Sequence, residues 1–175
     1  MLCARPLSHR DETDMDSLAY VYVIYINSTA QKVWDALTQP EITRRFWSNH
    51  RNSSDWKVGS PWKHEDFDDP SVVDISGTVL ESAVPHRLAV TWAPPIDALD
   101  ATKLSRLILD IAEDDGMVRI TLTHDQLPPN SGMAEGISEG WPLVMSSLKT
   151  LLETGSAMPE IWTRDGEDWT RARFE

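Results

Sequence analysis

Histidines and acidic residues are the first candidates for chemistry, and their spacing restricts what that chemistry can be. No His-x-x-x-His or His-Glu-x-x-His spacing occurs, so the usual helical zinc sites are not encoded. The segment His64-Glu65-Asp66 with Asp68-Asp69 offers oxygen ligands for a hard cation, but Pro70 fits a solvated charged turn equally well. We predict the charged turn and no metal site. The five histidines are His9, His50, His64, His86 and His124.

Phosphate-binding motifs are absent from the sequence. It contains no Walker A loop and no Gly-x-Gly-x-x-Gly, so we predict no cofactor. His124-Asp125 could place a base at a cavity mouth or simply end a strand. Arg44, Arg45 and Arg87 could bind an acidic ligand group or form surface ion pairs. No residue is predicted to be catalytic, because general acid–base catalysis requires an ionisable group placed beside the reacting atom.

The overall charge excludes several classes of partner. A net charge of −12 and a pI near 4.7 repel nucleic acids and anionic membranes. No apolar run approaches the roughly 18 residues that span a membrane. The single cysteine, Cys3, excludes an internal disulfide. We expect a cytoplasmic protein that neither binds nucleic acid nor inserts into membranes.

The segment 140–155, GWPLVMSSLKTLLETG, predicts a long helix with one apolar face. Pro142 is best tolerated in a first turn, so the helix is expected to start near Trp141, and Gly155 supplies a left-handed stop. The preceding GMAEGISEGW is expected to be a flexible approach. The apolar stripe consists of Trp141, Val144, Met145, Leu148, Leu151 and Leu152.

The N-terminal half predicts one strand followed by two short helices. LAYVYVIYI, residues 18–26, is apolar on both alternating faces, which favours a strand covered on both sides. Asn27 and Ser28 can cap a helix over STAQKVWDALT, and Pro40 opens a second one over PEITRRFW.

The middle of the chain predicts antiparallel strands. WKVGSPW, residues 56–62, resembles two pairing segments around a Gly-Ser-Pro turn. Residues 72–82 and 86–92 form a predicted hairpin, and Asp114-Asp115-Gly116 marks a second hairpin. In that second hairpin alternate residues, from Leu107 to Ile111 and from Val118 to Leu122, share the apolar face.

This order of elements predicts an α+β fold in which a curved antiparallel sheet of about six to seven strands wraps a long C-terminal helix. A curved sheet and a straight helix leave space between them, which is a usual place for apolar ligands. A fully packed core is the alternative. Eight tryptophans supply large rings for such a cavity. The residues predicted to line it are Trp62, Val90, Trp92, Leu107, Leu109, Val118, Ile120, Trp141, Val144, Met145 and Leu148.

Four stretches in register resemble one family. They are NSTAQKVWDALTQPE, DWKVGSPW, SGTVLESAVPHRLAVTW and GWPLVMSSLKTLLETG. Together they are similar to the activator of heat-shock-protein-90 ATPase homologue (AHSA-like) family of the START and pollen-allergen-like (SRPBCC) superfamily. The resemblance covers residues 18–155 and implies the helix-grip fold, a hydrophobic cavity between sheet and terminal helix, and no invariant cofactor.

Three functions follow from these observations, in order of preference. The first is non-enzymatic binding of a small hydrophobic or amphipathic ligand, including lipids, in the cavity. The second is a protein-interaction role resembling chaperone ATPase activation, and the third is an enzyme acting on an aromatic or polycyclic substrate. We expect a disordered leader over 1–17, a domain over 18–155, and a tail over 156–175. Its repeated Trp-Thr-Arg, at 162–164 and 169–171, could contact a second copy or another partner.

Overall fold

The fold is built on one antiparallel sheet. The computed structural model describes residues 19–129, 131–159, 163–164 and 167–168. Seven strands lie in the order β1-β7-β6-β5-β4-β3-β2, and every neighbouring pair is antiparallel. The strands are β1 (Tyr20–Ile26), β2 (His50–Ser53), β3 (Pro61–Asp66), β4 (Val73–Ala83), β5 (Arg87–Trp92), β6 (Ser105–Asp114) and β7 (Met117–Asp125).

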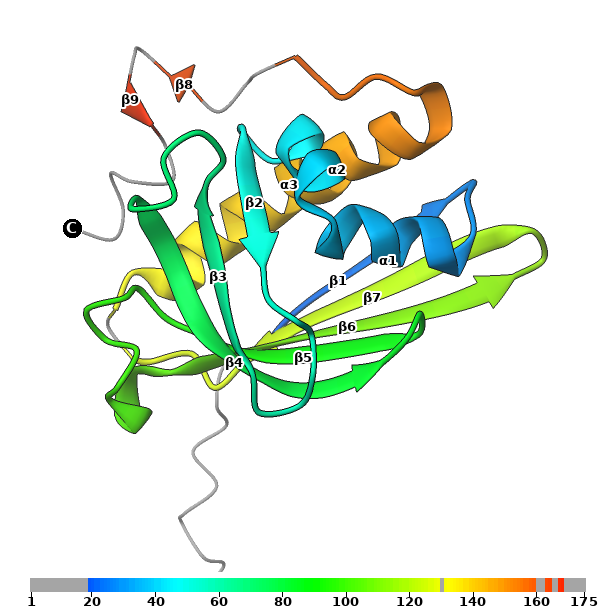
Figure 1. The fold of residues 1–175 in the computed structure, drawn as a ribbon. Coiled ribbons are helices and arrows are strands. Elements are labelled where there is room, and N and C mark those ends of the chain that lie inside the picture. Colours follow the sequence, from blue (N-terminus) through cyan, green and yellow to red (C-terminus); the bar gives the residue numbers. More distant parts are fainter. Residues whose placement is uncertain (1–18, 130, 160–162, 165–166, 169–175) are drawn as a thin grey trace, which may run out of the picture.

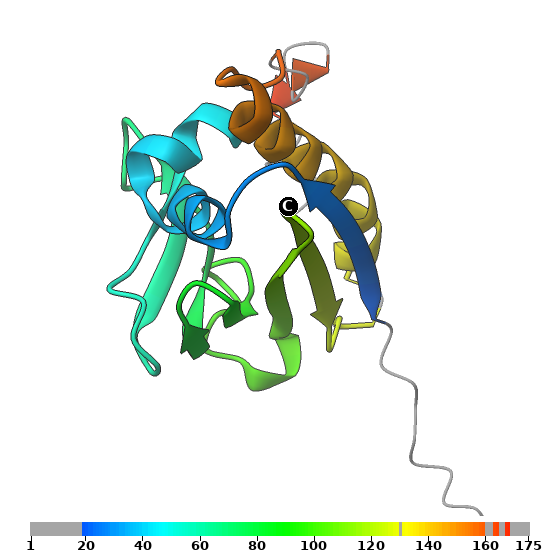
Figure 2. The same cartoon turned by 90° about the vertical axis from the view of Figure 1, so that its right-hand side faces the viewer.

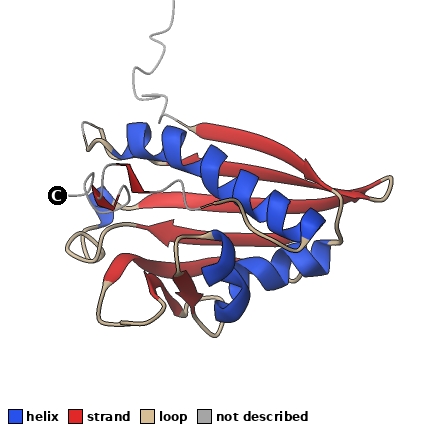
Figure 3. Ribbon diagram, turned by 90° about the horizontal axis from the view of Figure 1, so that it is seen from above, coloured by secondary structure: helices blue, strands red, loops and turns tan. Residues whose placement is uncertain are grey.

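Three helices lie on the concave side of this sheet. The long helix α3 (Met133–Thr154) crosses that side, while α1 (Ala30–Thr38) and α2 (Pro40–Phe46) lie beside it (Figures 1 and 3). Figure 2 shows the sheet curling beneath α3 as a half-barrel. The remaining elements are a short 3-10 turn, Ala101–Lys103, and a ladder between β8 (Thr163–Arg164) and β9 (Glu167–Asp168). The predicted α+β helix-grip architecture is confirmed.

The two predicted hairpins form as expected. The β4–β5 and β6–β7 pairs are both antiparallel, and the second register places Leu109 opposite Leu122 and Ile111 opposite Ile120. These four side chains are at most 3% exposed, so the alternation correctly identified the face of the sheet that α3 covers.

The first strand was predicted to be covered on both sides, and this is wrong. β1 pairs only with β7 and lies at the edge of the sheet. Val21, Val23 and Tyr25 are 57%, 48% and 43% exposed, while Ile26 on the other parity is buried. A run of apolar residues therefore marked an edge strand whose outer face is also apolar.

The α1 cap lies one residue later than predicted. Thr29, not Asn27 or Ser28, has the extended backbone of an N-cap, and its side chain accepts a hydrogen bond from the Lys32 N–H at 3.3 Å. Asn27 N–H instead donates to Glu153 Oε1 at 2.8 Å, which joins the end of β1 to the end of α3.

The predicted strand pair over 56–62 is only half present. β3 begins at Pro61, and residues 54–60 form the turn that connects it to β2, a strand absent from the prediction. The sequence of β2, HRNS, is entirely polar and has no apolar alternation, so it did not predict a strand. Its buried positions are His50 and Asn52, whose polar groups are paired inside the protein.

The long helix starts eight residues earlier than predicted, at Met133, and Pro142 lies inside it. The stretch read as a flexible approach is therefore its first two turns. Met133, Ile137 and Trp141 are all buried and four residues apart, so tertiary packing outweighs the N–H that proline lacks. Gly155 ends the helix as predicted, with φ of 82° and its N–H bonded to Leu151 O.

Two predictions fall largely outside the described residues, namely the leader over 1–17 and the Trp-Thr-Arg repeat. Among the helices that the structure describes, none is both long and apolar enough to cross a membrane.

Candidate ligand cavity

A small cavity lies between the sheet and the helices. Its volume is about 20 Å³, which is enough for roughly one water molecule. The described lining side chains include five indoles and no ionisable group. They are Leu37, Trp47, Asn52, Trp56, Trp62, Leu88, Val90, Trp92, Leu107, Leu109 and Trp141.

Tryptophan rings occupy most of the space that the curved sheet leaves under the helices. The ring centroids of Trp62 and Trp92 lie 5.4 Å apart, and those of Trp92 and Trp141 lie 5.5 Å apart. Trp47 meets Trp141 edge to face at 5.5 Å. These tilted contacts are favourable aromatic geometries, but flat rings tilted against each other leave a gap where they meet.

The indole N–H groups around the cavity differ in whether they have partners. Trp62 donates to Thr91 O at 2.9 Å, Trp56 to Thr38 O at 3.3 Å, and Trp141 to His124 Nδ1 at 3.2 Å. Trp92 Nε1 is buried and has no hydrogen-bond partner in the protein. A buried donor without an acceptor costs about 1–3 kcal/mol, so an acceptor brought by a bound molecule would stabilise this position.

His124 and Ser105 form a buried hydrogen-bonded pair behind Trp92. Because Trp141 donates to His124 Nδ1, the hydrogen of the neutral ring must be on Nε2, which lies 2.8 Å from Ser105 Oγ. Ser105 in turn donates to Trp92 O at 3.0 Å. Burial lowers the pKa of His124 to about 3. This tautomer donates to the serine and cannot take its proton, so the pair supports Trp92 and is not a nucleophile–base dyad.

Asn52 provides the polar part of the cavity wall, and buried histidines hold it there. Its Nδ2 donates to Leu37 O at 2.9 Å, and its Oδ1 lies 2.8 Å from His64 Nδ1. Burial, and secondly the charge of His50, lowers the pKa of His64 well below its ordinary value. Both ends of the Asn52 amide are therefore engaged.

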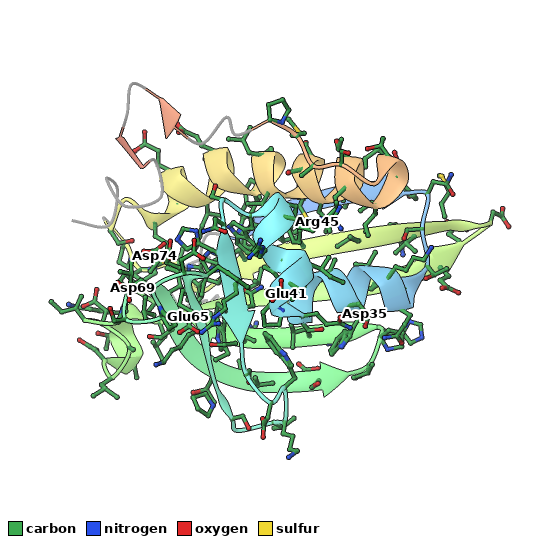
Figure 4. The ribbon with its side chains drawn as sticks, turned by 45° about the horizontal axis from the view of Figure 1, so that its top comes forward. Asp35, Glu41, Arg45, Glu65, Asp69 and Asp74 are labelled. Atoms are coloured by element: carbon green, nitrogen blue, oxygen red, sulfur yellow. The ribbon has the colours of Figure 1, made fainter. Side chains whose placement is uncertain are left out.

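His50 stacks on His64 with centroids 4.9 Å apart. Its Nδ1 lies 2.7 Å from Ser48 O and its Nε2 lies 2.8 Å from Asp74 Oδ2. This contact joins the start of β2 to β4. Figure 4 shows Asp74 near Asp69 and Glu65.

Trp56 is the most exposed of the five tryptophans that line the cavity. It is half-buried, on the turn between β2 and β3, and its φ of 58° is unusual for a large residue. The turn is held by hydrogen bonds from Trp56 N–H to Ser54 Oγ at 3.0 Å and from Gly59 N–H to Val79 O at 2.8 Å. Trp56 is thus the lining ring that is least enclosed by the rest of the fold.

Six of the eleven residues predicted to line a cavity do so, namely Trp62, Val90, Trp92, Leu107, Leu109 and Trp141. The other five are buried in the core but do not line the cavity. They are Val118 and Ile120 on β7, and Val144, Met145 and Leu148 on α3. Ligand binding by the eleven stays a prediction.

Five lining residues were missed by the sequence reasoning, namely Leu37, Trp47, Asn52, Trp56 and Leu88. Leu88 shares its parity with Val90 and Trp92 on β5, so strict alternation would have found it. Asn52 lies on β2, which was not predicted, and no sequence pattern marked it as a lining residue.

The other candidates for chemistry have structural roles. Asp66 Oδ1 accepts the backbone N–H groups of Asp68 and Asp69 at 2.9 and 2.8 Å, and Glu65 pairs with Arg51 at 2.8 Å. These carboxylates therefore bind groups of the protein itself, as in the charged turn that the sequence predicts. Glu65 and Asp69 lie on the β3–β4 side, away from Arg45 on α2 (Figure 4).

The arginines considered for ligand binding are engaged within the protein. Arg87 pairs with Glu81 at 2.8 Å and also with Asp110, and Arg45 donates to Gly155 O at 2.7 Å. The Arg44 guanidinium lies 4.2 Å from the Phe67 ring centroid. These contacts agree with the alternative that the arginines interact with other groups of the protein surface and do not bind a ligand.

Comparisons with known proteins agree with this fold. The profile of the family described as activator of Hsp90 ATPase homolog 1-like protein matches residues 27–153. No curated protein sequence matches the chain.

Solved structures share the fold. CalU16 from Micromonospora echinospora superposes with a TM-score of 0.66 at 18% identity, covering 86% of this chain and 76% of that one. PFC0360w, an HSP90 activator from Plasmodium falciparum, gives 0.64 at 18% identity over 77% and 95%. The Aha1 dimer from Colwellia psychrerythraea gives 0.64 at 18% identity over 79% and 98%.

Proposed function

The chain belongs to the activator of Hsp90 ATPase homolog 1-like family, and from this premise we propose that it binds a small apolar or amphipathic molecule between the sheet and α3. The observation that carries the proposal is the cavity itself, which is walled by indoles and lacks ionisable groups among its described lining residues. Such a wall favours binding over catalysis, since it offers no group to transfer a proton. The single cysteine of the sequence supports a cytoplasmic setting.

A cavity of about 20 Å³ must open to admit a ligand. We propose that the Trp56 ring moves out and that the ligand takes its place. Burying about 200 Å² of an indole-sized molecule at about 25 cal/mol per Å² gives about 5 kcal/mol, an affinity of order 10⁻⁴ M before the cost of moving Trp56. Larger apolar ligands would bind more tightly.

Thermal unfolding with indane, a bicyclic hydrocarbon of indole size, tests the proposal. Indane should raise Tm with concentration, because it binds the folded state only. Val90→Phe fills the cavity and should abolish the rise, whereas Val21→Phe, the same change on the exposed face of β1, should preserve it. An unchanged Tm in the unsubstituted protein at saturating indane rejects the proposal.

Trp56→Ala provides a second test with the opposite sign. Removing the ring opens the cavity and leaves indole-sized space, and apolar cavities of this kind take up apolar guests. The variant should be less stable alone but bind indane more tightly than the unsubstituted protein. Weaker binding would show that Trp56 is part of the permanent wall.

A second candidate function is interaction with another protein, supported by the loop between β5 and β6. Ile96 is 90% exposed and Leu99 is 101% exposed. The loop nevertheless has a defined shape, because Asp97 N–H donates to Pro94 O at 2.9 Å and Asp97 pairs with Lys103 at 2.6 Å. Exposed apolar side chains on a fixed loop are typical of contact sites.

The names of two structural relatives, an HSP90 activator and an Aha1 dimer, indicate which partners to test first. The ATPase rate of purified Hsp90 should rise when this protein is added, and rise less when the Ile96→Ser/Leu99→Ser double variant is added. A variant that lacks residues 156–175 tests the tail separately. Sedimentation of the chain alone reports a dimer. Unaltered ATPase and a monomeric mass in every variant would remove this second function.

A further inference from the structure

The unpartnered indole N–H of Trp92 points to the chemical class of the ligand. We infer that the cavity takes an uncharged, flat molecule carrying a hydrogen-bond acceptor, such as a ketone or ether oxygen, and that this acceptor binds Trp92 Nε1. The inference rests on the proposed function, since it names what the same cavity selects.

Trp92 lines the cavity and is 7% exposed, while its Nε1 is buried and has no acceptor in the protein. A ligand acceptor reaches this N–H when the cavity opens. The surroundings of Trp92 hold the ring in place, because Trp62 lies 5.4 Å and His124 5.4 Å from it between centroids. The N–H therefore cannot turn to water without disrupting the core.

Most of the neighbouring polar groups are already engaged. Three of the four other lining indoles donate to Thr91 O, Thr38 O and His124 Nδ1. Asn52 bonds Leu37 O with one end of its amide and His64 with the other. A ligand donor would compete with these bonds, whereas a ligand acceptor meets a donor that has none.

The charge of the ligand is restricted as well. The described lining side chains include no cation, so a carboxylate would lose its hydration without gaining an ion pair. The net charge of −12 adds a repulsive field for any anion. An ammonium group would likewise find no carboxylate among these residues. Neutral acceptors are the class that remains.

A matched set of three indole-sized probes tests the inference. Indane has no polar group, indan-1-one adds a ketone to the same skeleton, and indane-1-carboxylate adds a charge. We expect indan-1-one to bind about tenfold less tightly to Trp92→Phe than to the unsubstituted protein, since one neutral hydrogen bond is lost. Indane should bind both proteins with affinities within about threefold of each other, and the carboxylate should bind at least about a hundredfold more weakly than the ketone.

Trp92→Phe also changes the shape of the core, so a second measurement leaves the sequence intact. In ¹⁵N-labelled protein the indole N–H proton of Trp92 should move downfield on addition of indan-1-one and not on addition of indane. A ketone that leaves this proton unmoved, or that loses no affinity in Trp92→Phe relative to indane, overturns the inference while the proposed function stands. If none of the three probes binds, the proposed function itself is wrong.

Discussion

Individual side chains in this protein are held by buried hydrogen bonds more than by surface ion pairs. His124 is the clearest case, because it is fully buried, it is neutral, and both ring nitrogens have assigned partners. It joins Trp141 of α3 to Ser105 of β6, so the ring that supports the cavity also ties helix to sheet.

Stability should therefore fall in mild acid. The pKa of His124 is about 3 in the folded protein and 6.5 as its ordinary value. The unfolded chain binds the extra proton, so the free energy of unfolding is unaffected above pH 6.5 and decreases as pH falls towards 3. His124→Gln, which can still accept from Trp141 and donate to Ser105, should reduce this slope by about 1 kcal/mol per pH unit in denaturant titrations.

His86→Gln is the matched control for the pH experiment, because His86 is an exposed histidine in the turn between β4 and β5. Equal slopes in the His124→Gln variant and the unsubstituted protein would show that His124 is not the neutral buried group described above.

Gly77 is required by a close approach of three strands. A Cβ at this position would lie 1.9 Å from Thr91 O and 2.6 Å from Trp62 Nε1, in the path of the hydrogen bond between them. Gly77→Ala should lower the free energy of unfolding by about 2–4 kcal/mol in urea titrations, whereas its neighbour Ser76→Ala should change it by less than about 0.5 kcal/mol. A Gly77→Ala protein of normal stability would mean that Trp62 does not lie across the strand.

At the scale of elements, the start of α1 is governed by a single side chain. Thr29 caps α1 through its bond to Lys32 N–H, whereas Ser28 Oγ has no partner. Thr29→Ala should cost about 1 kcal/mol of stability. Ser28→Ala should cost nothing measurable, although the sequence pattern offered Ser28, with Asn27, as a cap. Thermal unfolding of the two variants distinguishes the positions, and the reverse order of stability would contradict the observed start of α1.

Elements dominated by periodicity were predictable, and those decided by tertiary contacts were not. The β4–β5 and β6–β7 hairpins carry both alternation and turn signals, and they form where expected. Pro142 predicts that α3 starts near Trp141. Because Met133 and Ile137 are buried, the helix instead begins before the proline, at Met133. β2 was invisible because its buried residues are polar.

The same distinction applies to the cavity. Parity along β5 and β6 correctly placed Val90, Trp92, Leu107 and Leu109 beside it. Trp47 and Trp56 contribute from irregular segments, which no period describes. For the same reason the size of the cavity could not be read from the sequence, since it depends on how far these two rings enter it.

At the scale of the whole molecule, the sheet curls beneath α3 (Figure 2). The small cavity between the sheet and the helices is lined by five tryptophans. The central claim is that this space is a binding site for a small molecule, entered by displacing Trp56. Ligand binding in this space is directly observable, because each tryptophan indole N–H gives its own NMR signal.

The most direct measurement is a ¹H–¹⁵N titration of the labelled protein with indane, following the indole N–H signals. The account predicts saturable shifts at the five lining tryptophans, Trp47, Trp56, Trp62, Trp92 and Trp141, with Trp34 unmoved because it is buried outside the cavity. Absence of shifts at saturating indane, or shifts of Trp34 as large as those of the lining residues, would contradict it.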